Sequence, residues 1–160
     1  RNDVMTCVGG KSRSLSVYNG LIAAKSLSPD KVLIHDVARP AVSENIITEI
    51  ILAINEETGA APGLPITDAL WKISDGEIEK TLDRDFIFRA QTPQGFPYSK
   101  ILEAHENRSD ERAFDDVELA KKSGLKVILK TGHKDNMKIT TPEDFSKISK
   151  ILVKKLDIKL

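Results

Sequence analysis

Two charged residues in the first quarter of the chain carry side chains suited to phosphate chemistry. Asp36 follows the apolar run of residues 32–34, where a short strand is expected to end. In open α/β sheets ligands gather at the carboxyl ends of the strands, and a carboxylate there can hold Mg²⁺ against the phosphates of a nucleotide. Arg39 follows closely, and its guanidinium matches the oxygens of a phosphate. Either residue could equally be an ordinary loop side chain, with Asp36 capping the loop.

A third cation and a glycine pair are weaker candidates for the same kind of site. Lys138 lies just before a predicted helix that starts after Thr141. The backbone N–H groups of a helix start favour an anion, although a single lysine is more often solvated surface. Gly9-Gly10, followed by the polar residues 11–13, would let the backbone approach a ligand. The pair matches neither GxGxxG nor GxxxxGK[ST], so alone it indicates only a turn.

Other reactive residue types give little support for catalysis. His35, His105 and His133 lack the spacing of a metal site, and Cys7 lies in an apolar segment that reads as a strand. A zinc centre and a thiol nucleophile are therefore not supported. Asp115-Asp116 could be a metal pair, but acidic residues in the first turn of a helix are ordinary.

The segments around these residues alternate between strand and helix patterns. Strands are expected over residues 4–8, 59–64 and 126–129 and in the run 31–36, which ends in polar residues. Helices are expected after Gly9-Gly10, where the apolar stripe is only approximate, after Ser43, from Tyr98, over 115–123 and after Thr141. This alternation predicts a parallel α/β sheet. Asp75-Gly76, between two further strand-like runs, predicts a hairpin that is inserted into the fold.

The composition is that of a single globular domain. The chain has 160 residues, of which 40% are hydrophobic and 30% charged. Lys plus Arg equals Asp plus Glu at 24 each, so no overall field attracts nucleic acid or an anionic membrane. With one cysteine, Cys7, and no long apolar run, we expect a cytoplasmic protein with no membrane partner. Because an apolar stretch begins soon after Arg1, we expect that an N-terminal segment has been lost.

Several short segments form an ordered pattern along nearly the whole chain. They are Gly9-Gly10 through Arg13, Ser16-Val17, Gly20-Leu21, His35 through Pro40, Pro65 through Asp68, Asp83-Arg84, Gln91 through Phe96, Asp115-Asp116, and Asn136 through Asp144. In order and spacing this pattern resembles the 2-C-methyl-D-erythritol 4-phosphate cytidylyltransferases of non-mevalonate isoprenoid biosynthesis. Each segment is weak by itself, and the set is specific.

The resemblance implies a Rossmann-like α/β nucleotidyltransferase fold, a three-layer sandwich forming one domain over residues 1–160. A projecting β-hairpin arm, about residues 66–89, would clasp a second subunit in a homodimer. The implied reaction is attack of a sugar-alcohol phosphate on the α-phosphate of CTP, with loss of pyrophosphate. Such a reaction needs positioning and charge neutralisation rather than a covalent protein intermediate.

Roles for individual residues also follow from the resemblance. Asp36 would bind Mg²⁺, and Arg39 and Lys138 would bind the substrate phosphate and the transition state. Arg84 would reach the substrate from the neighbouring subunit, so that Lys138, Asp36 and Arg84 are the catalytic set. The nucleotide would be contacted by Gly9, Gly10 and Ser16.

The sequence departs from the family pattern in three ways. The family's glycine-rich triphosphate loop has no counterpart after Arg1, so we expect the 160 residues alone to be inactive. Ala69 and Phe114 stand where the family usually has threonines that contact the substrate. Each lost hydroxyl would weaken binding by about tenfold, or would mark a different substrate. Lys11 replaces an acidic residue that helps to read cytosine, which bears on base selectivity.

Two alternatives remain beside the erythritol interpretation. Ribitol 5-phosphate cytidylyltransferases share the scaffold but more typically have Val before the Arg-Pro pair, where this chain has Ala38. Gly95 after the Thr-Pro-Gln run also favours the erythritol enzymes. The second alternative is an inactive dimerisation or substrate-half fragment, and the retained charged residues Asp36, Arg39, Arg84 and Lys138 argue against it.

Overall fold

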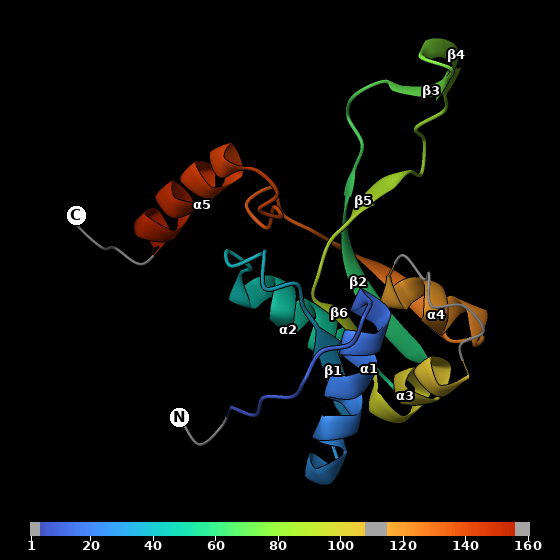
Figure 1. The fold of residues 1–160 in the computed structure, drawn as a ribbon, viewed down its shortest axis with the longest axis vertical. Helices are drawn as coiled ribbons and strands as arrows, with labels where there is room; N and C mark the ends of the chain where they lie inside the picture. Colours follow the sequence, from blue (N-terminus) through green and yellow to red (C-terminus); the bar gives the residue numbers. More distant parts are fainter. Residues whose placement is uncertain (1–3, 108–114, 156–160) are drawn as a thin grey trace.

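The computed structural model describes residues 4–107 and 115–155 and contains a mixed sheet with helices on both sides (Figure 1). The strands of the sheet are β1 (Lys31–Ile34), β2 (Thr58–Pro65), β5 (Phe88–Ala90), β6 (Gln94–Pro97) and β7 (Lys126–Thr131). The helices are α1 (Arg13–Ala24), α2 (Glu44–Ala53), α3 (Tyr98–Glu106), α4 (Asp116–Lys122) and α5 (Pro142–Lys155), with a short 3₁₀ turn, η1 (Lys25–Leu27).

The sheet is not parallel throughout, so that part of the prediction is wrong. Strand β7 runs parallel to β2, but β6 pairs antiparallel with β1 and β2, and β5 pairs antiparallel with β2. The strand order is β1-β6-β2-β5, with β7 on β2. The chain returns from the hairpin insertion directly into β5 and β6, and an antiparallel return needs no crossover helix. The turn-forming residues 91–97 concealed β6 in the sequence.

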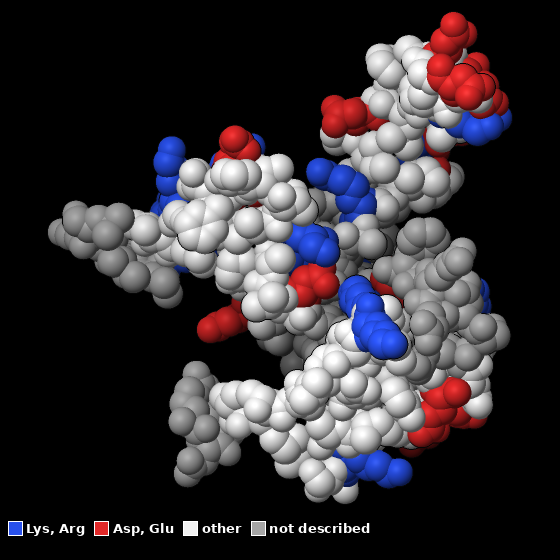
Figure 2. Space-filling model, in the orientation of Figure 1, with Lys and Arg blue, Asp and Glu red and all other residues white. Residues whose placement is uncertain are grey.

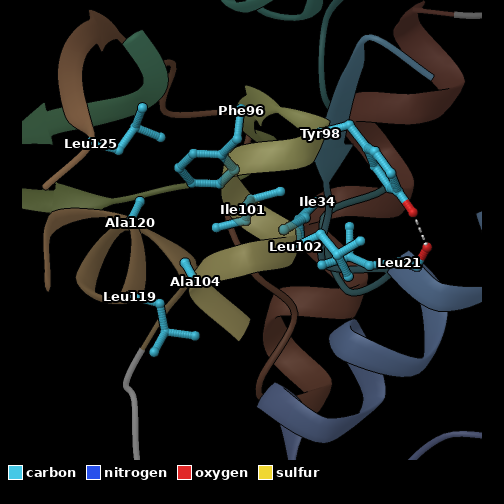
Figure 3. Packing of buried hydrophobic residues seen from close by; sticks show 10 residues of the cluster. All are labelled: Leu21, Ile34, Phe96, Tyr98, Ile101, Leu102, Ala104, Leu119, Ala120 and Leu125. Carbon is cyan, nitrogen blue, oxygen red and sulfur yellow. Dashed lines mark hydrogen bonds between the residues drawn. The ribbon is translucent and has the colours of Figure 1, made fainter. Parts of the chain in front are cut away.

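Side chains of alternate strand residues build one core on each face of the sheet, which makes the three layers. On one face Ile34 and Phe96 pack with residues of α1, α3 and α4 (Figure 3). The hydroxyl of Tyr98 donates to the carbonyl of Leu21 at 2.7 Å and ties α3 to α1. On the other face Leu33 and Ala60 pack against α2. The expected three-layer α/β sandwich is confirmed.

The predicted starts of three helices are confirmed by their N-capping contacts. Ser43 accepts from the backbone of Ile46 at 3.4 Å, and Asp115 accepts from that of Glu118 at 2.9 Å. Thr141 accepts from the backbone of Asp144 at 3.2 Å. Such caps satisfy backbone donors that the first turn leaves unpaired. Among the described helices, none has the length and apolar character needed to cross a membrane.

The hairpin predicted at Asp75-Gly76 forms an arm that projects from the sheet (Figure 1). Its strands are β3 (Leu70–Ser74) and β4 (Glu77–Leu82), which pair antiparallel. Asp75 and Gly76 have φ of 51° and 86°, the left-handed conformation of a tight two-residue hairpin turn. Large apolar side chains remain in water on the arm, including Trp71 at 58% exposure.

The strand predicted over residues 4–8 is wrong. In the described part of the chain these residues are assigned to no strand, and Val4, Cys7 and Val8 are exposed. A strand needs a neighbour to satisfy its backbone groups, and an apolar run alone does not supply one. Cys7 is therefore not a buried strand residue.

Candidate active site

The centre of the site is Asp36, just beyond the end of β1, and it lies among three cations. Its Oδ2 is 3.4 Å from Nζ of Lys138 and 3.4 Å from Nε of Arg39, and its Oδ1 is 3.7 Å from Nε of Arg13. The side chain of Asp36 is 16% exposed. Figure 2 shows acidic and basic side chains side by side near the middle of this face, below the arm.

The surrounding charges decide the ionisation of Asp36. Burial by itself raises the pKa of the Asp36 carboxyl, because water solvates the charged form best. The positive charge and hydrogen bond of Lys138, followed by the charges of Arg13 and Arg39, outweigh burial and bring this pKa below its ordinary value. Asp36 is therefore a carboxylate at neutral pH, which is the form that binds a cation.

Arg39 is held more firmly than the sequence suggested. Its side chain is 11% exposed, and its Nη1 donates to the carbonyl of Asn136 at 2.8 Å. Its Nη2 donates to the carbonyl of Ala90 at 3.3 Å. The backbone of Ile139 donates to the carbonyl of Ala38 at 2.8 Å. These bonds join the loop after β1 to the segment that carries Lys138, so two distant parts of the sequence meet at Asp36.

The site rests on a polar loop that the sequence presented only as a structural turn. Thr92 accepts from the backbone N–H of Asp36 at 3.0 Å and lies 3.0 Å from Nδ1 of His35. The side chain of Asn136 donates to the carbonyl of Thr92 at 2.8 Å, and Gln91 donates to that of His133 at 2.9 Å. This loop bonds to both charged segments and fixes their spacing.

Arg13 is a site residue that the sequence reasoning mentioned only as part of a glycine turn. Its Nη1 lies 2.8 Å from Oδ2 of Asp116, and the other carboxylate oxygen of Asp116, Oδ1, lies 3.0 Å from Nε2 of His105. Asp115 caps α4 and accepts from Gln94 at 3.0 Å. Asp115 is thus the N-cap of α4, and Asp116 is a buried carboxylate that contacts Arg13 and His105. Within residues 4–107 and 115–155, no cluster of three potential metal ligands occurs.

The predicted nucleotide residues lie at the start of α1, next to Arg13. The backbone of Gly10 donates to Oγ of Ser16 at 3.0 Å, and that hydroxyl donates to the carbonyl of Ser12 at 2.9 Å. Gly9 and Gly10 are exposed, and a Cβ added at Gly10 would overlap Leu15. The glycine pair thus folds back over the first turn of α1 and leaves its backbone open to solvent.

Arg84 lies apart from the other predicted catalytic residues. It follows β4 on the arm and donates to the backbone carbonyl of Thr67 across the arm. Ala69 is also on the arm and is exposed, whereas Phe114 lies outside the described residues. The structure thus brings together Asp36, Arg39 and Lys138, and leaves Arg84 on the projecting hairpin.

The three-layer body, the projecting hairpin and the charged site beyond β1 define a Rossmann-like α/β fold of the nucleotidyltransferase class. Comparison with known sequences is more specific. The profile of the family described as 2-C-methyl-D-erythritol 4-phosphate cytidylyltransferase matches residues 1–154. The chain belongs to this family.

Individual relatives agree with that assignment. The chain is 48% identical over 155 residues to a Ruegeria protein named bifunctional enzyme IspD/IspF, covering 97% of the chain and 40% of that protein. It is 44% identical over 144 residues to a 2-C-methyl-D-erythritol 4-phosphate cytidylyltransferase of Cereibacter sphaeroides, covering 90% and 64%. The chain thus spans less than two thirds of the length of these curated relatives.

Solved structures share the fold. The cytidylyltransferase of Thermus thermophilus is 34% identical with a TM-score of 0.83, over 91% of this chain and 72% of that one. The Francisella tularensis enzyme is 26% identical with a TM-score of 0.84, over 94% and 73%.

Proposed function

We propose that the chain carries the site that transfers a cytidylyl group from CTP to 2-C-methyl-D-erythritol 4-phosphate and releases pyrophosphate. The observation that carries the proposal is the carboxylate of Asp36 among three cations beyond the end of β1. This is the position at which α/β sheets bind ligands. A relative whose name states this reaction, the Cereibacter sphaeroides protein, is 44% identical to the chain over 144 aligned residues.

The cations divide into fixed and movable ones. Arg39 is tied to two backbone carbonyls and is 11% exposed, so it can orient a phosphate without moving. Lys138 is 47% exposed and 3.4 Å from Asp36, so it can turn from the carboxylate to an incoming phosphate. A cation that meets the negative charge developing on the α-phosphate stabilises the transition state more than the ground state. Lys138 is our candidate for that role.

Asp36 is our candidate ligand for Mg²⁺. Magnesium is often held by one or two carboxylates together with substrate phosphates, so a lone ionised aspartate beside a phosphate site fits it. The neighbouring cations lie 3.4–3.7 Å away, longer than tight ion-pair bonds, and leave the carboxylate oxygens able to accept a metal. When bound, the ion would neutralise charge on the triphosphate.

The start of α1 and the arm would supply the remaining contacts to the two substrates. Gly9, Gly10 and Ser16 would contact the cytidine of CTP. Arg84 would reach the sugar-alcohol phosphate of a neighbouring subunit in a homodimer held by the arm. The exposure of Trp71 (58%) and Phe86 (95%) on the arm supports this, because apolar patches of this kind usually mark an interface. We also propose a cytoplasmic location.

Ribitol 5-phosphate is a second candidate substrate. The observation in its favour is Ala69, which offers no hydroxyl where the resemblance implies a substrate-binding threonine. Loss of one neutral hydrogen bond costs about 1 kcal/mol. A different sugar alcohol would not need that bond.

The test is pyrophosphate release from CTP and Mg²⁺ with each of the two sugar-alcohol phosphates. It should be run on the 160-residue chain and on a version extended ahead of Arg1 with the corresponding segment of a relative. We expect release with 2-C-methyl-D-erythritol 4-phosphate in the extended version. Release only with ribitol 5-phosphate would establish the second candidate, and silence from both folded proteins would favour the inactive-fragment alternative.

A further inference from the structure

Arg13 joins two carboxylates that belong to different parts of the fold. Its Nη1 lies 2.8 Å from Oδ2 of Asp116, and its Nε lies 3.7 Å from Oδ1 of Asp36. Asp116 is 1% exposed and Asp36 is 16% exposed. Because a guanidinium is planar and rigid, fixing its Nη1 at Asp116 limits the positions that its Nε can take at Asp36.

Asp116 is a firm anchor for this contact. Its Oδ1 lies 3.0 Å from Nε2 of His105, which is fully buried on α3. Its backbone N–H donates at 3.2 Å to the side chain of Gln94, which is 1% exposed on β6. Asp116 cannot shift without disturbing both a core helix and a core strand. Arg13 therefore links the Asp36 site to a residue that is held in place by the core.

The three cations do not approach Asp36 in the same way. Lys138 and Arg39 both lie nearest Oδ2, at 3.4 Å, whereas Arg13 pairs with Oδ1. If a phosphate draws Lys138 away, Oδ2 loses one of its partners. Arg13 is retained by Asp116, so the contact at Oδ1 persists while the substrate binds.

We propose that Arg13 is a positioning residue, which fixes the Asp36 carboxylate in the orientation that binds the divalent cation accompanying the nucleotide. This inference rests on the proposed function, because it takes Asp36 as the metal ligand. In this role the planar guanidinium of Arg13, which spans two carboxylates, matters as well as its positive charge. Partners that orient a metal ligand typically contribute a factor of 10 to 100 in metal affinity.

The first variant is Arg13→Lys, which keeps a positive charge next to Asp116 but cannot span both carboxylates. The matched control is Arg89→Lys, at an exposed arginine on β5 outside the site. One measurement is uptake of Mn²⁺ by the extended version in the presence of CTP, followed by electron paramagnetic resonance of the free ion and compared with CTP without protein, because CTP itself binds Mn²⁺. The other is the Mg²⁺ concentration that gives half-maximal pyrophosphate release in the extended version.

We expect Arg13→Lys to weaken Mn²⁺ uptake and to raise the half-maximal Mg²⁺ concentration by about tenfold or more. The rate at saturating Mg²⁺ should fall much less, and Arg89→Lys should match the parent. A purely structural role for Arg13 would lower the melting temperature without moving the metal requirement. Unchanged metal binding in a folded Arg13→Lys protein would overturn the proposal.

A second variant, Asp116→Asn, tests the anchor and serves if Arg13→Lys does not fold. Asn keeps the size of the side chain but removes the charge that holds Arg13. It should reproduce the metal phenotype, and the double variant should be no worse than either single one, because both break the same path. Additive effects would contradict the path through Asp116.

Failure of the proposed function gives a different result. If the parent binds Mn²⁺ with CTP but releases no pyrophosphate with either sugar-alcohol phosphate, the proposed reaction is wrong, and the variants still report on Arg13. If the extended parent takes up no Mn²⁺ beyond that bound by CTP alone, Asp36 is not a metal ligand and the inference about Arg13 is overturned.

Discussion

The Asp36 site and the arm are opposite in construction. At the site, residues from α1, the loop after β1 and the segment before α5 converge, and the central carboxylate is 16% exposed. The arm is one local hairpin whose side chains, such as Ile73 at 53% and Ile78 at 56%, stay in water. Asp36, Arg39 and Lys138 thus meet within one chain, while the arm presents exposed apolar side chains and carries Arg84 away from them. The difference favours a body that holds most of the charged site and an arm that both joins two subunits and brings Arg84 to the site of the neighbour.

The largest effect should come from removing the movable cation of the site. We expect Lys138→Ala to lower turnover by about 100-fold or more, because a charge contact made mainly in the transition state is lost. The variant should fold, since Lys138 is 47% exposed. Pyrophosphate release and circular dichroism of the extended version test both points, with the exposed Lys100→Ala on α3 as control. An unchanged rate would remove Lys138 from the site.

A charge on the arm should change assembly and leave the body intact. We expect Trp71→Glu to weaken dimerisation by more than tenfold, because it replaces a large apolar contact with a charge that must be desolvated. Sedimentation equilibrium would measure the dissociation constant. Lys72→Glu, at a neighbouring exposed residue paired with Glu79, controls for added charge. A monomeric parent, or equal dimer affinities for the parent and Trp71→Glu, would contradict the contrast between arm and body.

Alanine substitutions at two glycines test how tightly the core of the body and the arm are packed. A Cβ at Gly95 on β6 would lie 2.6 Å from Cδ1 of Ile54, whereas one at Gly76 on the arm would meet nothing within 4 Å. Gly95→Ala should therefore cost about 1–3 kcal/mol by overpacking the core. Gly76→Ala should cost about 1 kcal/mol, from its left-handed φ of 86° alone. Urea denaturation would rank them, and the reverse order would refute the comparison.

The smallest effect concerns acid stability at the site. Because the pKa of Asp36 is lowered in the folded chain, its ionised form stabilises the fold at neutral pH, and this contribution is lost as the pH falls through the lowered value. Lys138→Met removes the largest favourable charge, so the pKa of Asp36 should rise and the loss should begin at higher pH. Carbon-13 NMR of the Asp36 carboxyl would follow it. An unchanged pKa of Asp36 in Lys138→Met would show that Lys138 does not lower it.

The arm could be predicted from local sequence because its signal is local. Asp75-Gly76 between two strand-like runs determines the turn, and the helix caps at Ser43 and Thr141 are equally short-range. The mixed sheet could not be predicted in this way, since the antiparallel pairing of β6 depends on where the chain returns from the arm. Residues 4–8 were wrongly predicted as a strand from their apolar character, because a strand also needs a neighbouring strand to pair with.

The candidate site was predicted in part. Their places after a strand and before a helix made Asp36 and Lys138 only weak candidates, and the family resemblance gave them roles. The structure brings the two side chains within 3.4 Å, and those roles stay predictions. Arg13 was not assigned a role, because its partner Asp116 is far away in the sequence and looked like an ordinary first-turn acid. The burial of Asp116 beside His105 depends on how α3 and α4 pack together, so it cannot be predicted from the residues next to Asp116 in the sequence.

Mixing two inactive variants tests most directly whether the body of one subunit and the arm of another form one site. Lys138→Ala and Arg84→Ala proteins, in the extended version, would be dissociated, mixed and allowed to reassociate before pyrophosphate release is measured. We expect neither alone to be active and the mixture to regain part of the parent rate, because some sites then combine an intact Lys138 with an intact Arg84. No recovery, with subunit exchange demonstrated by mass spectrometry, would contradict a site shared between body and arm.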